Sequence, residues 1–386
     1  MDEVGDSWIA RRRDFHQHPE LGFAERRTAG IIAGILAGYG IETHTGLGGT
    51  GVLGVLRRGN SRRSIGLRTD IDALPIQEAN TFVHRSINEH QFHGCGHDGH
   101  TVMLLAAAET LSSRDTIDGT VHFIFQPNEE NGLGAQAMMD DGLFERFPMD
   151  AVFGIHNMPG IPAGHFAVRR GAMMTFEDDF VISVSGVGGH ASMPDRTRDP
   201  VVVAAEIISA LQTIVARSMN PMDSGVVSVT EILTDGARNV IPGNVTIKGD
   251  ARGLSGHTQE LIETRMREVA VNIGKAHGVE VSIDYSHEFI VLVNAAEETD
   301  LAIRAATETV GAENVEAECE PAACSEDFAR MLQAVPGCYL LLGNGCAGHN
   351  GMPLHNPAYD FNDEVLGTGA AYWVRLAENV LAAEAG

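Results

Sequence analysis

A run of eight residues, His93-Gly94-Cys95-Gly96-His97-Asp98-Gly99-His100, concentrates side chains that bind metals or transfer protons. It holds one thiol, one carboxylate and three imidazoles, with no apolar residue among them. Cys95 and His97 are one residue apart, so in a loop both side chains can reach a common point, and the glycines permit the positive φ angles that this requires. The alternative is a polar, glycine-rich surface turn that binds nothing. We interpret the run as part of a metal site.

Two adjacent carboxylates, Glu129 and Glu130, follow a segment with apolar residues at alternate positions from Val121 to Phe125. Alternation predicts a strand. Neighbouring side chains diverge at the end of a strand, so one carboxylate can bind a metal ion while the other moves protons. A Glu-Glu pair by itself is more often a solvated acidic turn. Two single histidines in short polar segments, His156 and His355, are likewise weak evidence taken alone.

The elements that must position these groups are short apolar strands that alternate with helices. Strands are predicted at 51–56, 64–67, 119–125, 151–155 and 338–342, and helices at 8–40, 101–111 and 366–383. This alternation predicts an α/β sheet with substantial parallel pairing. Asp70 and Asp72, then Glu129 and Glu130, then His156 each come just after one of these strands. Open α/β sheets bind ligands at that carboxyl edge.

A different order of elements begins near Asp179. Strands are predicted at 180–185, 226–232, 245–253 and 279–285, with helices at 200–217 and 258–277. The order βαββαβ is that of a ferredoxin-like α+β layer, and strand-helix alternation of the earlier kind resumes after Leu292. At 386 residues the chain exceeds one hydrophobic core. We therefore predict a discontinuous catalytic α/β/α domain, residues 1–178 and 292–386, with a mixed, mostly parallel sheet. The inserted α+β domain, residues 179–291, would serve as a lid and dimerisation domain.

Composition excludes several classes of partner. The net charge is −25, and only Lys248 and Lys275 are lysines among the 27 basic residues, so nucleic acid and anionic membranes are poor partners. No apolar stretch approaches the roughly 18 residues that span a bilayer, and the first residues are acidic instead of basic. The five cysteines are odd in number and lack paired spacing, which indicates a reducing compartment. We expect a cytoplasmic protein.

Six segments stand in a recognisable order along the chain. They are Arg12–Gly22, Asp70–Pro75, Gly94–Thr101, Gln126–Glu130, Gly188–Ser192 and Leu354–Pro357. This order closely resembles the di-metal amidohydrolases of the hippurate hydrolase and indole-3-acetyl-amino-acid hydrolase type, within the aminoacylase and carboxypeptidase superfamily. The resemblance spans essentially the whole chain. One departure is Asn128, where the family usually carries a small residue.

The resemblance implies two divalent metal ions per subunit, with a bridging thiolate. The implied ligands are Cys95 as the bridge, with His97, Glu130, His156 and His355. Thiolate and imidazole suit Zn²⁺, and carboxylate and imidazole also suit Mn²⁺, Co²⁺ or Ni²⁺. We expect Zn²⁺ or Mn²⁺ first. Asp70 and Asp72 resemble the carboxylates that hold ligand histidines in one tautomer.

The same resemblance assigns the chemistry. Glu129 resembles the general base that takes a proton from a metal-bridging water and returns it to the leaving amine. His190 resembles a donor to the oxyanion, often supplied by the neighbouring subunit of a homodimer. Asn239 and Arg252 resemble the residues that bind the free carboxylate of a small-molecule substrate. The expected reaction is cleavage of the amide bond of an N-acyl amino acid, or a related small conjugate, by a metal-bridging hydroxide.

Two alternatives remain open. A dipeptidase or carboxypeptidase of the same superfamily would use the same chemistry but would need a pocket for a substrate amino group. A relative that binds metal or ligand without catalysis would have a different function altogether. The presence of Glu129 beside a complete set of metal ligands favours an enzyme.

Overall fold

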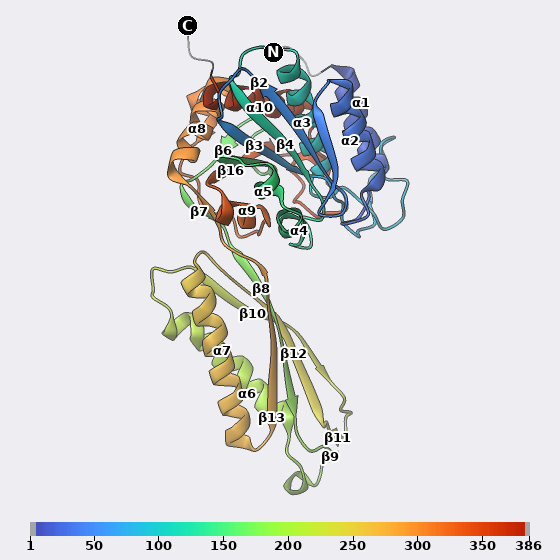
Figure 1. The fold of residues 1–386 in the computed structure, drawn as a ribbon. Coiled ribbons are helices and arrows are strands. Elements are labelled where there is room, and N and C mark those ends of the chain that lie inside the picture. The colour runs from blue at the N-terminus through green and yellow to red at the C-terminus, as the bar shows by residue number, and fades with distance from the viewer. Residues whose placement is uncertain (1–4, 383–386) are drawn as a thin grey trace. The chain divides into compact units, whose positions relative to one another are not determined.

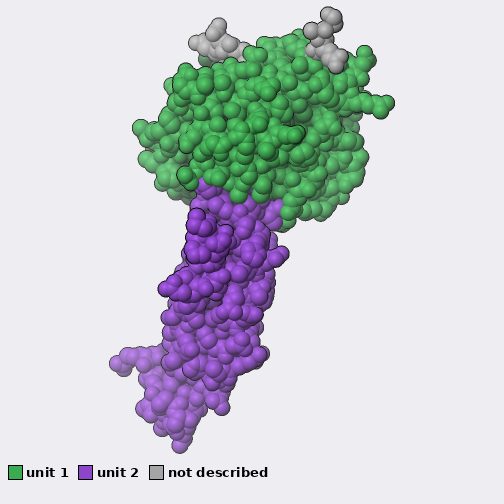
Figure 2. Space-filling view, turned by 90° about the vertical axis from the view of Figure 1, so that its left-hand side faces the viewer, with its two compact units in different colours: residues 1–173, 293–320, 326–386 green, residues 174–292, 321–325 purple. Residues whose placement is uncertain are grey.

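The computed structural model describes residues 5–382 and divides the chain into two compact units (Figures 1 and 2). Unit 1 takes the residues up to 173, residues 293–320 and those from 326 on. Unit 2 takes residues 174–292 and 321–325. The functional division at 179 and 291 stays a prediction.

Unit 1 is built on an eight-stranded sheet with the order β1-β2-β4-β3-β5-β16-β6-β15. Its strands are β1 Glu42–Leu47, β2 Gly51–Arg58, β3 Ser64–Asp70, β4 Gly119–Gln126, β5 Ala151–Pro159, β6 Phe166–Ala167, β15 Val315–Glu316 and β16 Gly337–Gly345. The four central strands β4, β3, β5 and β16 are parallel, whereas β1, β2 and β6 pair antiparallel with β2, β4 and β16. The mixed, mostly parallel α/β sheet expected from the sequence is confirmed.

Helices of unit 1 form two groups around this sheet (Figure 1). The larger group comprises α1 Asp6–Gln17, α2 Arg26–Gly38, α3 His97–Ser112, α8 Ala296–Val310 and α10 Leu366–Val380. In it, α3 packs against α1, α2 and α10, and α10 packs against α8. The smaller group comprises α4 Gly134–Asp140, α5 Leu143–Arg146 and α9 Phe328–Ala334, with α4 in contact with both α5 and α9.

Two helix boundaries differ from the sequence-based expectation. The helix predicted at 8–40 is two helices, because Pro19 lacks the backbone N–H and the free φ angle that a continuous helix would need. The helix predicted from Thr101 begins at His97. The end of the predicted metal-binding run, residues 93–100, therefore lies inside the first turn of this helix. The second difference matters for the site, because it places His97 and His100 on a rigid element.

Unit 2 is a four-stranded antiparallel sheet with the order β10-β12-β8-β13. Its main elements are β8 Phe176–Ser185, α6 Pro200–Thr213, β10 Gly225–Thr234, β12 Asn244–Gly253, α7 Gly256–His277 and β13 Glu280–Phe289. A small sheet pairs β9 Gly189–His190 with β11 Val240–Ile241. The pair of β7 Gly171–Met174 and β14 Leu292–Asn294 has most of its residues in unit 1. Every second side chain of β8 is buried, and α6 and α7 pack on the sheet. This arrangement is the predicted ferredoxin-like layer.

One helical segment of the described chain, Pro200–Ser218, has the length and composition of a membrane span, with a mean hydropathy of 1.5. The expectation that no apolar stretch approaches 18 residues is wrong here. Val203 and Ile207 pack into the core of unit 2. Only 28% of the segment is buried, since Val201 and Val202 lie on its exposed side. Core helices of globular proteins can have the same length and apolar composition, so the segment is weak evidence for a membrane span.

Candidate metal centre

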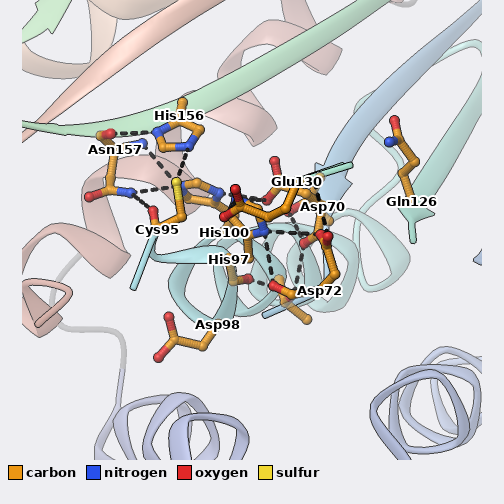
Figure 3. A network of polar contacts seen from close by, with 12 residues as sticks. Asp70, Asp72, Cys95, His97, Asp98, His100, Gln126, Glu130, His156 and Asn157 are labelled. Carbon is orange, nitrogen blue, oxygen red and sulfur yellow. Dashed lines mark hydrogen bonds and ion pairs between the residues drawn. The ribbon is translucent and has the colours of Figure 1, made fainter. Parts of the chain in front are cut away.

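Four of the predicted ligands, Cys95, His97, Glu130 and His156, gather at the carboxyl edge of the parallel strands (Figure 3). Asp70 is the last residue of β3, and Glu129 follows the end of β4 by three positions. His156 lies in β5, beside β3. Because parallel strands end at the same edge, residues far apart in sequence meet there.

Glycine at position 96 makes the approach of the metal-binding run possible. Gly96 caps α3 with a φ of 91°, a left-handed angle that strains any residue with a Cβ. A Cβ at this position would lie 2.3 Å from Asn157 Nδ2 and 2.5 Å from the hydroxyl of Tyr359. Asn157 Nδ2 also donates a hydrogen bond to the carbonyl oxygen of Cys95 at 2.6 Å. The close contact holds Cys95 and His97 on either side of the turn.

His97 is oriented for coordination through Nε2. Its Nδ1 lies 3.1 Å from Asp72 Oδ1 and 3.0 Å from the Asp72 carbonyl oxygen, so this nitrogen carries the proton. Its Nε2 lies 3.9 Å from Glu130 Oε1. Both of these atoms are buried, and neither has a hydrogen-bond partner among the described residues. Buried polar atoms are rarely left unpaired, so the pair fits a cation placed between them.

The remaining predicted ligands complete the cluster. His156 Nε2 lies 3.4 Å from Cys95 Sγ, and its Nδ1 donates to the carbonyl oxygen of Asn157. His355 Nε2 lies 3.5 Å from Glu130 Oε2. The ligand atoms of Cys95, His97 and His156 lie within 4.8 Å of one another, as do those of Cys95, Glu130 and His355. The structure thus brings together all five predicted ligands in two overlapping sets.

His355 reaches the cluster through an unusual backbone conformation. It has a φ of 65°, which is uncommon for a residue other than glycine. Its backbone N–H donates to the carbonyl oxygen of Gly94 at 2.8 Å, which ties the 353–357 segment to the metal-binding run. Strain of this kind is typical of functional positions.

Electrostatics divide the cluster into neutral imidazoles and a site that favours positive charge. Burial lowers the pKa of His156 and of His355, so both are neutral and able to ligate. Burial also lowers the pKa of His97, but Asp70 and Asp72 outweigh it and raise the value to about 10. Burial raises the pKa of Glu130 to about 8. The raised pKa values of His97 and Glu130 mean that this part of the cluster retains protons. A metal cation bound there would supply the same positive charge beside the carboxylates.

Glu129 lies in a different environment from Glu130. It is buried, and one carboxylate oxygen lies within 4.8 Å of oxygens of Glu326 and Asp327. Burial raises the pKa of Glu129 well above its usual range, and the carboxylate of Glu326 adds to the shift. A carboxyl group that holds a proton readily is suited to proton transfer.

His100 belongs to the run but is already fully hydrogen-bonded. Its Nδ1 donates to Asp70 Oδ1 at 2.7 Å, and its Nε2 accepts from the backbone N–H of Asn157 at 2.9 Å. It therefore has no free nitrogen for a metal. The two aspartates differ in their partners, since Asp72 holds His97 whereas Asp70 holds His100.

The segment from Arg12 to Gly22 anchors the start of α3. Arg12 and His16 are fully buried, and His16 Nδ1 lies 2.8 Å from Asp98 Oδ2. Arg12 Nη1 lies 3.4 Å from the same oxygen. Asp98 directly follows His97, so these contacts fix the helix turn that carries the predicted ligand.

Three charged residues of this region, Arg68, Glu326 and Asp327, were not predicted from the sequence. All three are buried, and Arg68 Nη2 binds Glu326 Oε1 at 2.8 Å and Asp327 Oδ1 at 3.2 Å. A charged residue inside an otherwise apolar strand was the available signal for Arg68, because such a residue needs a buried partner.

The predicted oxyanion donor, His190, and the predicted substrate-binding residues, Asn239 and Arg252, lie in unit 2. His190 and Asn239 are neighbours, because β9 pairs with β11 and the backbone N–H of Ala191 donates to the carbonyl oxygen of Asn239. Arg252 stands at the other end of β12, where its guanidinium binds Glu177 at 2.9 Å and Asp250 at 3.0 Å. The structure therefore groups His190 with Asn239 and separates both from Arg252.

Comparisons with known proteins give a consistent result. The model of peptidase family M20/M25/M40 matches residues 66–379. The hippurate hydrolase of Campylobacter jejuni is 41% identical over 366 residues, covering 95% of this chain and 94% of that enzyme. An IAA-amino acid hydrolase of Arabidopsis thaliana is 36% identical over 384 residues, covering 98% and 86%. A solved structure of a dinuclear metal binding peptidase of the M20 family from Bacillus subtilis matches with a TM-score of 0.84 at 30% identity, covering 97% and 98%.

Proposed function

The chain belongs to peptidase family M20/M25/M40, and on this premise we propose that it is a metal-dependent amidohydrolase that cleaves N-acyl amino acids. The observation that carries the proposal is the meeting of five potential ligands beside a buried, protonatable Glu129. Relatives named for hydrolysis of hippurate and of IAA-amino acids support the substrate class. The resemblance stated from the sequence is confirmed.

The residues that would hold two divalent ions are the five named above. They are Cys95, His97, Glu130, His156 and His355. Bound ions of this kind lower the pKa of a shared water towards about 7 and polarise the amide carbonyl. We propose Zn²⁺ or Mn²⁺, because the set mixes one thiolate with imidazoles and a carboxylate. Asp72 keeps His97 in the tautomer that this role requires.

Glu129 is the proposed general base and acid. Its carboxylate accepts a proton from the attacking water and later gives it to the leaving amine nitrogen. Glu129 is free for this role because Glu130 is the carboxylate that faces His97 and His355. The buried position excludes bulk water from the proton transfer.

His190 is the proposed donor to the developing oxyanion. The backbone N–H of Ser192 donates to His190 Nδ1 at 3.2 Å, so this nitrogen is unprotonated and Nε2 carries the proton. An imidazole in this tautomer can donate from Nε2 to an oxygen that gains negative charge.

The arrangement of unit 2 supports a homodimer. His190 lies beyond the Asn244 end of β12, whereas Arg252 is eight positions further along that strand. At about 3.3 Å per residue, the backbone of Arg252 lies about 26 Å along the strand from Asn244, and His190 lies beyond Asn244. A small substrate cannot contact both. If both serve one substrate, His190 and Arg252 must come from different copies of the chain.

Exposed apolar residues of unit 2 offer a surface for that second copy. β10 is an edge strand, and its Val226, Ile232 and Leu233 are exposed. Val201 and Val202 of α6 are exposed as well. Edge strands and apolar patches of this kind favour association.

The test is hydrolysis by the purified protein after incubation with Zn²⁺ or Mn²⁺. Acetyl, benzoyl and indole-acetyl amino acids form one set of substrates, and free dipeptides form the second. We expect turnover of at least one acylated substrate, loss of turnover on chelation, and recovery on adding metal. Glu129→Gln should keep both ions but lose about a hundredfold to ten-thousandfold in kcat. Turnover of dipeptides alone would favour the peptidase alternative, and full activity of Glu129→Gln would refute the base assignment.

A further inference from the structure

The loop that carries Glu129 and Glu130 is tied at both ends to one carboxylate. This loop, residues 127–133, joins the end of β4 to the start of α4. At its first end, Gln126 Nε2 donates to Asp327 Oδ1 at 2.7 Å. At its second end, the backbone N–H of Ala135 donates to Asp327 Oδ2 at 2.8 Å.

Arg68 holds that carboxylate from a third side. Its Nη2 lies 3.2 Å from Asp327 Oδ1, and its Nε donates to Gln126 Oε1 at 2.9 Å. Arg68, Gln126 and Asp327 thus form a closed set of hydrogen bonds, and all three side chains are buried. A bond network that is fully paired in a low-dielectric interior is rigid.

The loop itself needs such support. Asn128 has a φ of 50°, which is costly for a residue with a Cβ. The chain turns so tightly that a Cβ on Gly134 would lie 1.6 Å from the carbonyl oxygen of Pro127. The hydrogen bonds within the loop join residues close in sequence, such as the bond from the Gly132 N–H to the Glu129 carbonyl oxygen at 2.7 Å. A strained turn persists only where its surroundings hold it.

We propose that Asp327 is a positioning residue, which clamps both ends of the 127–133 loop and thereby fixes Glu129 and Glu130. The inference rests on the proposed function of Glu129 as the base. Asp327 itself takes no part in the chemistry, because both of its oxygens already accept hydrogen bonds. It acts through the backbone of the loop.

The acidic cluster of Glu129, Glu326 and Asp327 is consistent with a positioning role for Asp327. Glu129, Glu326 and Asp327 have oxygens within 4.8 Å of one another, which is close enough for a cation. However, Glu326 Oε1 accepts from Arg68 Nη2 and from the backbone N–H of Phe328, and Oε2 accepts from the hydroxyl of Tyr339. Glu326 and Asp327 are therefore already paired, and they form a scaffold beside Glu129.

The first test is Asp327→Asn. The new amide has one oxygen, so if this oxygen keeps Ala135 N–H, the amide nitrogen faces two other donors, Gln126 Nε2 and Arg68 Nη2. We expect kcat to fall between tenfold and a hundredfold, KM to stay within twofold, and both metal ions to be retained by elemental analysis. In the metal-free protein, hydrogen exchange of the amides at 129–135 should become at least tenfold faster.

A double variant tests the direction of the hydrogen bonds. In Gln126→Glu/Asp327→Asn, the new carboxylate accepts from the new amide and still accepts from Arg68 Nε. Net charge and shape stay the same as in the unmodified protein. We expect the double variant to recover at least half of the lost kcat and most of the exchange protection, whereas Gln126→Glu alone should be impaired because it brings two carboxylates together.

Asp118→Asn is the matched control. Asp118 stands just before β4, at the opposite end of this strand, and accepts from the backbone N–H groups of Asn60 at 2.6 Å and Ser61 at 2.7 Å. It therefore clamps another turn in the same way. We expect this variant to keep kcat and the exchange rates at 129–135.

The outcomes separate the inference from the proposed function. If Asp327→Asn is folded and keeps both kcat and the exchange protection of the loop, the clamp is refuted. A failure of the double variant to recover either quantity also refutes it. If Asp327→Asn does not fold, Gln126→Met removes one end of the clamp alone, and unchanged loop exchange in that variant overturns the proposal. If the unmodified enzyme hydrolyses nothing, the proposed function fails, while loop exchange still decides the clamp.

Discussion

His16 should make the stability of unit 1 depend on pH in the alkaline range. The imidazole is fully buried, with Nδ1 2.8 Å from Asp98 Oδ2 and Nε2 3.2 Å from Glu78 Oε1. Burial lowers the pKa of His16, but the hydrogen bonds to Asp98 and Glu78 outweigh it and raise the value to about 9. The folded protein therefore holds this proton more tightly than the unfolded chain.

The sign and the size follow from linkage. The pKa of His16 is about 9 in the folded protein, against about 6.5 for an ordinary histidine. This difference corresponds to about 3 kcal/mol at about 1.4 kcal/mol per pH unit. Because the folded-state value is raised, the contribution is fully present below pH 6.5 and is lost as the pH rises through about 9.

The assay is urea unfolding of the metal-free protein between pH 6 and pH 9.5, comparing the unmodified chain with His16→Gln. The difference in free energy of unfolding between the two should shrink by about 3 kcal/mol across this window. His44→Gln is the control, because His44 pairs with Glu42 on an exposed part of β1 and such pairs contribute below about 1 kcal/mol.

A difference between the unmodified chain and His16→Gln that stays constant from pH 6 to 9.5 would refute the reasoning. It would mean that His16 is neutral in the folded state, and that Arg12 alone balances Asp98. A difference that grows with pH would contradict the sign of the argument. Either result would also argue against our assignment that the contacts of His16 and Arg12 with Asp98 fix the first turn of α3.

Three further outcomes are expected. Asp72→Asn should weaken metal binding by about 10-fold to 100-fold, measured by competition with a chelator, because it loosens the hold on His97 Nδ1. Gly96→Ala should lower the free energy of unfolding by at least about 2 kcal/mol, whereas Gly160→Ala, with a φ of 94° and no atom near its Cβ, should cost only the strain of its backbone angle. Val202→Glu on the exposed side of α6 should give a monomer by light scattering, and an unchanged oligomer would exclude this face from the interface.

The grouping of several predicted site residues at one edge of the sheet follows a rule of topology, whereas the full set of proposed ligands came from the family resemblance. Asp70, Glu129 and His156 each come at or just after the end of an apolar segment, and parallel strands bring such ends together. The sheet order did not have to be known for this argument. For these three residues only the strand ends and the fold class were needed, and both are encoded locally in the pattern of apolar residues.

The clamp around the loop could not be predicted in the same way. Asp327 lies 201 positions from Gln126 along the chain, and nothing local in Ser325-Glu326-Asp327-Phe328 indicates a partner. The predicted strand at 64–67 stopped one residue short of Arg68, because a charge reads as the end of a strand. Hydrogen bonds between distant segments depend on side-chain directions, which a sequence does not display.

The charge balance at the centre of unit 1 favours the uptake of cations. Buried carboxylates outnumber guanidinium groups there. Arg68 pairs with Asp70, Glu326 and Asp327, whereas Asp72, Glu129 and Glu130 have no ion pair to a guanidinium among the described residues. Burying unpaired charge costs several kcal/mol per group, so the protein without metal takes up protons, as the raised pKa values of Glu129 and Glu130 indicate. Bound divalent cations would replace those protons. The same excess of negative charge that would attract metal ions therefore raises the pKa of Glu129, which supports its proposed role in proton transfer.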